Sequence, residues 1–380
     1  MQDWIKKMSK DVCDEMTVEI FSRLPTKSLL RFRAVSKSLC ARIGSPAFIR
    51  LHALRSPKKF LCIHHDGYKD EGIYKTKNFY TFHSEGQLPY NSYMGINPIK
   101  YPFIDARSTF GSCNGILCLR AFGKGVTLWN PSTRRKVAIR DPRTFRGDSP
   151  VYGFGYDPVI QDYKILRISH PTLFVCTVKT RTWRKIASPN ECSRVTSYQC
   201  LFNGALHWVE THVRTLLFDK YTYYDHHIMT FDFSSEVCSS IELPEPTWET
   251  SGLAVIKGSL AVISRISVRH NDCTIWVRRE YNDTSAFWSV AFKLNTVSYG
   301  NQVDRFFQLT ATDDLLLDPY GRGIKVYNPE TEVLSQLADF SASSHIVGMY
   351  ICVESLELLD MGNSCYHGKQ IARKKAKPKK

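Results

Sequence analysis

The chain has 380 residues, of which 43% are apolar and 12% aromatic, and its formal net charge is +15. This composition supplies ample side chains for a packed core, which excludes a wholly disordered protein, and the length suits a small module plus one large domain, or two medium domains. Because no run of 18 apolar residues occurs and residues 1–10 lack the apolar core of a signal peptide, we expect a soluble protein of the nucleus or cytoplasm, without a membrane partner.

A short helical region follows a leader at residues 1–10 and extends over residues 11–55. Its apolar residues recur at helical spacing, and Pro25 ends one helix and can open the next, because proline fixes φ and has no N–H group. About 40 residues are too few to bury all the apolar groups of such a module. Some of these side chains, among them Leu24, Leu29, Leu30, Phe32 and Val35, are therefore expected to face outward or to pack on another protein.

The order Glu-Ile-Phe-x-Arg-Leu-Pro-x-Lys-Ser-Leu-Leu-Arg-Phe-Arg-x-Val-Ser-Lys-Ser at residues 19–38 closely resembles an F-box, and the Phe48-Ile49-x-x-His52 ending is similar to that of plant F-box proteins. The resemblance implies binding to a Skp-family adaptor, and through it to a cullin and a RING subunit. The residues expected to contact the adaptor are Met16, Ile20, Leu24, Pro25, Leu29, Leu30, Phe32, Val35 and Leu39.

The sequence departs from the F-box pattern at two places. Val12-Cys13 stands where Leu-Pro usually opens the motif, and Leu39 stands where a tryptophan is common. Both changes keep bulk or apolarity, so we expect docking to survive with altered affinity. The alternative is a helical hairpin that caps the next domain without any partner.

A β-domain is predicted over residues 58–362. Short runs of β-branched and aromatic residues alternate there with turns, and strand–turn–strand units recur with anchors near Asn130, Val178, Asp232 and Asn328, spaced by about 50 residues or twice that. With a weaker copy at 79–86 and a candidate hairpin at 274–294 the units number six. Inner strands such as 114–119 and 203–209 lie between them, and a last strand near 349–359 is expected to complete the first unit.

This pattern predicts an α+β multidomain protein, in which an all-α module precedes an all-β domain that is a degenerate propeller of about six blades. A β-sandwich or an irregular half-barrel is the alternative. The motifs FGSCNGILCL, LWNPSTRR, YGFGYDPVIQDYKILRI, FNGALHWV and YICVESLELL resemble, in order, the F-box-associated domain of plant F-box proteins, including kelch-type and S-locus-type relatives. The resemblance covers residues 10–360 and implies a non-catalytic substrate receptor of a ubiquitin ligase, with an unknown target protein.

No catalytic, cofactor or metal site is expected. The Gly-x-Gly at 153–155 lacks a third glycine and a following helix, so a turn between strands is the better account. The twelve cysteines form no Cys-x-x-Cys pair, which indicates reduced thiols, and Cys62-Ile63-His64-His65 has no second pair at zinc spacing. His226-His227 is expected in a connecting loop, and blade packing is expected of Trp129, Trp183, Trp208, Trp276 and Trp288.

Residues 363–380 form a basic tail. From Gly368 onward it holds seven Lys or Arg and no acid, which leaves +8 for the rest of the chain. Such a run is typical of a nuclear-localisation signal, a loose polyanion contact or a solvated terminus. Beside the receptor, three other functions stay open: a propeller-fold binding protein unrelated to ubiquitin, a propeller hydrolase with its active site in the central channel, and a polyanion or nucleic-acid binder that uses this tail.

Overall fold

The computed structural model of this chain describes residues 14–55, 59–67, 77–84, 99–100, 108–121, 125–142, 150–188, 193–195, 199–215, 222–245, 249–265, 272–279, 287–295, 305–307, 314–318, 324–328, 330–331, 333–338, 344–359 and 361. The predicted leader and the predicted basic tail lie outside these residues.

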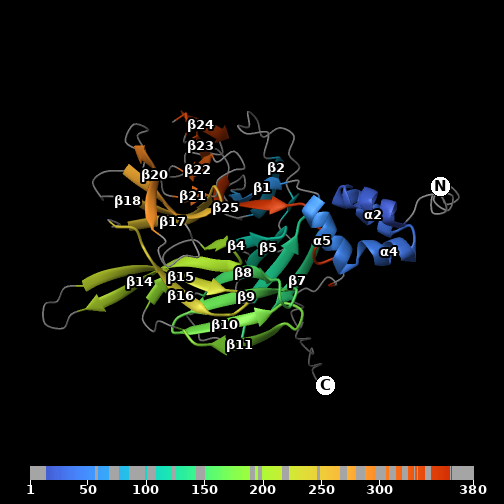
Figure 1. Cartoon of the computed structure of the whole chain (residues 1–380), viewed down its shortest axis with the longest axis horizontal. Coiled ribbons are helices and arrows are strands. Elements are labelled where there is room, and N and C mark those ends of the chain that lie inside the picture. The colour runs from blue at the N-terminus through green and yellow to red at the C-terminus, as the bar shows by residue number, and fades with distance from the viewer. Residues whose placement is uncertain are drawn as a thin grey trace, which may run out of the picture.

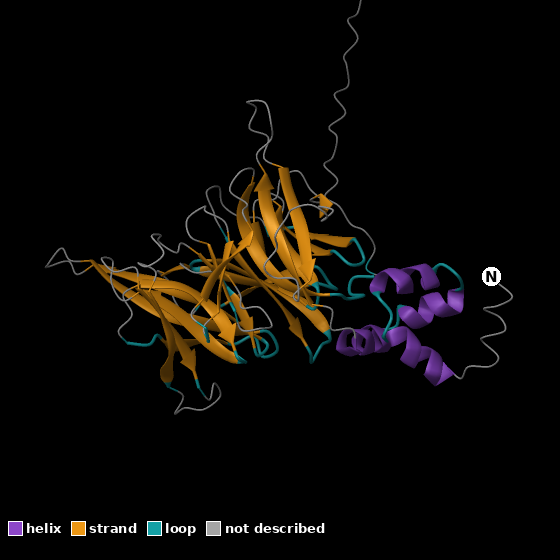
Figure 2. Cartoon of the chain, turned by 90° about the horizontal axis from the view of Figure 1, so that it is seen from above, coloured by secondary structure: helices purple, strands orange, loops and turns teal. Residues whose placement is uncertain are grey.

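Four short helices make up the N-terminal module and stand to one side of the strands (Figure 2). They are α2 (Asp14–Ser22), α3 (Thr26–Arg33), α4 (Lys37–Ile43) and α5 (Pro46–Arg55). Pro25 occupies the N-cap of α3 with a φ of −58°, as its fixed ring predicts. Ser36 caps α4, because its hydroxyl accepts a hydrogen bond from the Leu39 N–H at 3.1 Å. The predicted helical module is confirmed.

Six antiparallel sheets follow the helices in the described part of the chain (Figure 1). Blade 1 contains β25 (Ser344–Val353), β1 (Lys59–Gly67), β2 (Lys77–Ser84) and β3 (Ile99–Lys100). Blade 2 contains β4 (Ser108–Cys113), β5 (Ile116–Ala121), β6 (Gly125–Asn130) and β7 (Arg135–Ile139). Blade 3 contains β8 (Val151–Asp157), β9 (Asp162–Ser169), β10 (Thr172–Thr177) and β11 (Thr182–Ile186).

In blade 4, β12 (Ser193–Val195) and β13 (Cys200–Phe202) both pair with β14 (Ala205–Thr215), followed by β15 (Thr222–Asp232) and β16 (Cys238–Glu242). Blade 5 contains β17 (Glu249–Ile256), β18 (Ser259–Arg265), β19 (Asp272–Arg278) and β20 (Trp288–Asn295). Blade 6 contains β21 (Arg305–Phe307), β22 (Leu315–Asp318), β23 (Ile324–Asn328) and β24 (Val333–Ala338). The predicted propeller of about six blades is confirmed.

The last strand joins the first blade. β25 pairs antiparallel with β1, with Cys62 opposite Tyr350, so the sheet that begins the domain is completed by residues almost 300 positions later. The predicted closure is therefore confirmed, but the strand runs over Ser344–Val353 rather than over 349–359. Residues after Val353 leave the sheet, with a turn at 357–359, and they contact the helices instead.

The predicted repeat anchors are turn residues that fold back on their own backbone. The Asn130 side-chain oxygen accepts from the Ser132 and Thr133 N–H groups, and Asp232 and Asn328 accept in the same way from residues two and three positions later. This is the Asx turn that Asn and Asp favour. In blade 3 the equivalent position is Thr177 rather than Val178, because Thr177 and Asp232 each accept a backbone N–H from the residue four positions on.

A second repeated turn joins the first two strands of three blades. Asn114-Gly115, Asn203-Gly204 and Lys257-Gly258 all have positive φ, between 47° and 78°, at both residues. Two consecutive positive φ values are what a two-residue type I′ hairpin requires, which explains why Asn-Gly precedes two of the predicted inner strands.

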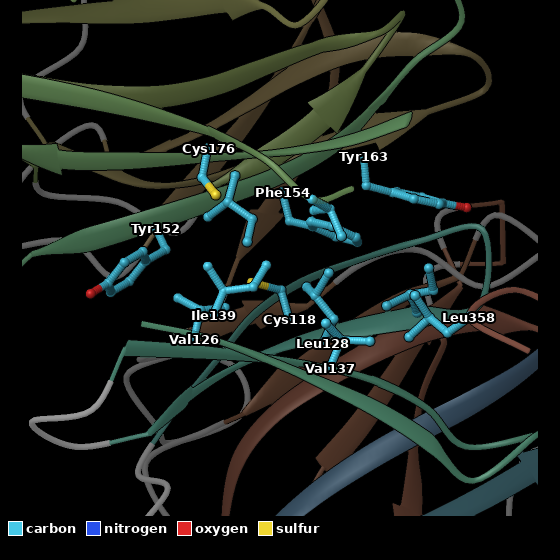
Figure 3. Close-up of a cluster of buried hydrophobic side chains, with 13 residues drawn as sticks. Cys118, Val126, Leu128, Val137, Ile139, Tyr152, Phe154, Tyr163, Cys176 and Leu358 are labelled. Atoms are coloured by element: carbon cyan, nitrogen blue, oxygen red, sulfur yellow. The ribbon is translucent and has the colours of Figure 1, made fainter. Parts of the chain in front are cut away.

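Apolar clusters fill the spaces between neighbouring blades. Figure 3 shows the cluster between blades 2 and 3, where Cys118 and Leu128 meet Phe154 and Cys176, and where Leu358 from the end of the chain lies at one side. Further clusters join blade 1 to blade 2, blade 3 to blade 4, blade 4 to blade 5 and blade 5 to blade 6.

The Gly-x-Gly of residues 153–155 lies inside strand β8, so the predicted turn is wrong. A Cβ atom at Gly153 would collide with the Leu206 side chain, and one at Gly155 with the Phe233 ring. Both neighbours belong to blade 4, because Leu206 lies in β14 and Phe233 directly follows β15. The glycines are therefore explained by the close approach of blade 4, and nothing about a nucleotide is needed.

The tryptophans pack between strands and blades, as predicted. Trp129 and Trp208 are buried in clusters between blades. The indole N–H groups of Trp183 and Trp288 donate to the Arg140 and Glu242 carbonyls of the preceding blade, at 2.6 and 2.8 Å, while Trp276 donates to Ser264.

A buried ion network adds a polar connection between blades 3 and 4. The Lys164 ammonium lies 2.6 Å from both Asp157 and Glu236 and donates to the Phe233 carbonyl at 2.7 Å. Burial opposes ionisation of Asp157, but Lys164 and the N–H groups of Val159 and Ile160 outweigh it and lower the pKa of that carboxyl.

Candidate functional site

The helical module exposes apolar side chains at three of the nine positions predicted to contact a partner. Met16 is 58% exposed, Ile20 47% and Val35 43%. Met16 and Ile20 are four residues apart in α2 and therefore lie on one helix face, together with Glu19, and Arg23 follows directly after the helix. We call this set, Met16, Ile20 and Val35, the exposed apolar set.

Five more of the predicted positions are half-buried: Leu24, Pro25, Leu30, Phe32 and Leu39. Leu24, Leu30, Phe32 and Leu39 pack at the margin of the module's core, and Phe32 stacks on Phe21 with ring centroids 5.0 Å apart. Each leaves part of its side chain accessible.

Leu29 does not face outward. Its side chain is 0% exposed and packs with Ile43 and Phe48, so this position supports the helices from inside and is not available to a partner. Helical spacing predicted that Leu29 lies on the apolar face of its helix. Spacing alone does not tell whether another part of the same chain covers that face. Here Leu356 and Leu359, from the segment after β25, complete the cluster around Leu29.

The helical module is mainly basic. Residues 14–55 contain eight Lys or Arg and three Asp or Glu. Glu19 pairs with Arg23, at 2.7 Å, and with Arg55, which links α2 to α5. These two guanidinium groups, Arg23 first, hold the pKa of Glu19 below its usual value. Exposed apolar side chains on a basic module suit a partner that offers apolar side chains together with carboxylates.

The centre of the ring holds a cavity of about 250 Å³. Inner strands β4, β8, β13, β17 and β25 line it, through residues such as Phe110, Phe154, Leu253 and Met349. Among the residues that line this cavity there is no Asp, Glu, His, Lys or Arg. Burial raises the pKa of the Cys200 thiol in its wall to about 12, so this group stays protonated and is a poor nucleophile at neutral pH.

His226 and His227 lie on strand β15, so the predicted loop is wrong. They stand opposite Thr211 and Glu210 of β14, and the His226 ring is 2.9 Å from the Thr211 hydroxyl while His227 is 3.0 Å from Asp225. The polar and aromatic composition around His226 suggested a loop, but these residues extend a long β14–β15 hairpin with eleven residues in each strand. Within the described ranges, no three His, Cys, Asp or Glu side chains form a group that could hold a metal ion.

The cysteines in the described part of the chain form no disulfides, and this includes the neighbouring Cys62 and Cys352 on the paired strands β1 and β25. Burial, with Cys352 beside it, raises the pKa of Cys62 well above its usual value. Of His64 and His65 only the backbone, in β1, is described. None of the described helices is long and apolar enough to cross a membrane.

Comparison with known proteins gives two family matches that divide the chain as the structure does. Residues 10–51 match the F-box domain, and residues 96–364 match the F-box associated beta propeller domain. Among curated relatives, the chain is 29% identical over 248 residues to "Putative F-box protein At3g16210" of Arabidopsis thaliana, which covers 62% of each chain. It is 26% identical over 357 residues to "F-box/kelch-repeat protein At3g23880" of the same plant, covering 83% of this chain and 86% of the relative.

Among solved structures, the chain is similar to an oligogalacturonate lyase in complex with manganese, with a TM-score of 0.44 and 8% identity over 73% of this chain and 78% of the other. The second family match alone spans well over half of the chain. With its N-terminal helices and its ring of six sheets, this chain belongs to the family of F-box proteins that carry an F-box-associated β-propeller domain.

Proposed function

We propose that this chain is the substrate-recognition subunit of a Skp, cullin and F-box (SCF) ubiquitin ligase. The F-box binds a Skp-family adaptor, and through it a cullin and a RING subunit, while the β-propeller binds a target protein that is then ubiquitinated and degraded. The observation that carries the proposal is the exposed apolar set, whose three side chains lie in the matched F-box and stay between 43% and 58% exposed.

The proposed role needs no chemistry from this chain. Holding a target beside a ubiquitin-charged enzyme raises the effective concentration of the target's lysines, which accelerates transfer without a covalent step on the receptor. The lining of the central cavity, which carries no charged side chain among the described residues, supports a binding role over a hydrolase. The basic tail that would serve a nucleic-acid binder lies outside the described residues.

The cellular site that fits this role is the nucleus or the cytoplasm. Nine described cysteines form no disulfide, and two of them, Cys62 and Cys352, lie side by side as thiols. Reduced thiols suit a compartment that glutathione and thioredoxin keep reducing.

The test is adaptor capture by full-length variants expressed in plant cells. Ile20→Asp combined with Val35→Asp places two charges where we expect apolar contact, and should abolish co-purification of the adaptor. Val333→Asp is the matched control, because Val333 is a 56% exposed valine on β24 of the propeller. Equal adaptor recovery from the double variant and the control would reject the docking assignment.

A further inference from the structure

The residues that follow the last propeller strand contact both domains. We call Glu354–Leu359 the closing segment. On the helical side, the Glu354 carboxylate accepts a hydrogen bond from the Thr26 N–H at 2.7 Å. Pro25, the N-cap of α3, provides no side-chain cap of its own. The first turn of α3 is therefore capped by a carboxylate 328 residues away in the chain, which also suits the positive end of the helix dipole.

Two leucines of the closing segment extend this contact into the core of the F-box. Leu356 is 0% exposed and Leu359 5%, and they pack with Leu29, Ile43 and Phe48. A module of about 40 residues cannot enclose a core alone, and here the missing side chains come from the far end of the protein.

The other side of the closing segment is held by blade 2. The Asn130 amide donates to the Ser355 carbonyl at 3.2 Å, to the Ser355 hydroxyl at 3.1 Å and to the Glu357 carbonyl at 2.9 Å. Leu358, between the two leucines that face the helices, packs instead in the cluster between blades 2 and 3 (Figure 3). Alternate side chains of one short segment thus enter the cores of two different domains.

A second contact lies beside the first. The Arg50 guanidinium of α5 donates to the Gln161 side-chain oxygen, in the β8–β9 turn of blade 3, at 2.9 Å. Glu357 is half-buried near Arg50, Lys179 and the Tyr163 hydroxyl, and desolvation raises its pKa although these groups oppose the shift. In Figure 1 the end of β25 points toward α5, where these contacts gather.

We propose that the closing segment fixes the F-box in one orientation on the propeller. A module attached only through the chain between α5 and β1 could rotate about that tether. The closing segment provides a second attachment, in which one side caps and fills the F-box and the other is bonded to blade 2. This inference rests on the proposed function. It means that the F-box and the target-binding propeller keep a fixed orientation and distance, so the receptor determines the distance between the bound target and the ubiquitin-charged enzyme.

The decisive experiment measures the distance between the two domains in the full chain, without any adaptor. Spin labels are placed through unnatural amino acids at Lys27 on α3 and Lys293 on β20, both of which are exposed. Pulsed electron resonance should give one narrow distance distribution. Asn130→Asp keeps the oxygen that accepts from Ser132 and Thr133, as Asp232 does in blade 4, but removes the amide donor to the closing segment. This variant should lose the single narrow peak.

Asp232→Asn is the matched control, because its turn is retained and no bond to the closing segment is involved; its distribution should equal that of the unchanged chain. If Asn130→Asp fails to fold, Glu354→Ala decides, since Glu354 is only half-buried and lies outside the propeller core. Glu354→Gln, which keeps an acceptor for the Thr26 N–H, should restore the narrow peak. A narrow, unshifted distance distribution in folded Asn130→Asp overturns the proposal, whether or not the adaptor binds. If Asn130→Asp does not fold, the same result in Glu354→Ala overturns it.

Discussion

Removing the Ile20 side chain should weaken adaptor binding without harming the fold. Ile20 is 47% exposed in the free chain. Burying a whole isoleucine side chain contributes about 1.5–3 kcal/mol, so covering the accessible half contributes roughly 0.7–1.5 kcal/mol. At about 1.4 kcal/mol per tenfold, Ile20→Ala should raise the Kd for the adaptor about 3- to 10-fold. Because the lost surface is exposed in the free protein, the free energy of unfolding should stay within about 0.5 kcal/mol.

The assay is calorimetric titration of the purified full chain with a purified Skp-family adaptor. Met16→Ala, at a 58% exposed position on the same face of α2, should give a loss of similar size, and Val333→Ala on the propeller should give none. The reasoning is refuted if Ile20→Ala and Met16→Ala bind as tightly as the unchanged chain, or if Val333→Ala weakens binding equally.

Three further predictions concern stability. Leu29→Ala should cost about 2–5 kcal/mol, because a fully buried leucine leaves a cavity, and hydrogen exchange should rise in α3 while the propeller strands stay protected; uniform exchange would contradict the placement of Leu29 in the F-box core. Lys164→Met leaves Asp157 and Glu236 without their buried cation and should cost about 3–5 kcal/mol, seen as a lower melting temperature, whereas an unchanged one would show that the network is not stabilising. Burial lowers the pKa of His207 to about 4 from 6.5, so the stability this neutral ring contributes is present above pH 6.5 and is lost as pH falls toward 4. In urea unfolding at pH 7 and pH 5, the free energy of unfolding should fall less between the two pH values in His207→Gln than in the unchanged chain. An equal fall in both proteins would exclude His207 as a source of the pH dependence.

The repeats could be predicted from sequence because their turns depend on local chemistry. The side chains at three anchors accept hydrogen bonds from backbone N–H groups two and three residues later, at Asn130, Asp232 and Asn328. The Asn-Gly pairs adopt the positive φ values that most other residues avoid. Each turn is therefore determined by residues that are adjacent in the sequence. The anchor predicted at Val178 is one residue too late, because Thr177 occupies the position that Asn or Asp holds in the other blades.

The contacts that could not be predicted join residues far apart in the chain. Apolar periodicity placed Leu29 on an apolar face, but its cover, Leu356 and Leu359, was expected in a strand. Nothing local to Pro25 indicates that Glu354 caps the helix it opens. Gly153 and Gly155 are likewise explained only by side chains of the next blade. In each case the deciding neighbour is set by ring closure or blade packing, which a local pattern does not contain.

The most direct test of the docking account is hydrogen exchange of the full chain, with and without saturating adaptor. The account predicts that the adaptor forms a one-to-one complex and slows exchange in α2, α3 and α4, around Met16, Ile20 and Val35, while the propeller strands exchange as before. No complex, or protection confined to the propeller with the helices unchanged, would contradict it.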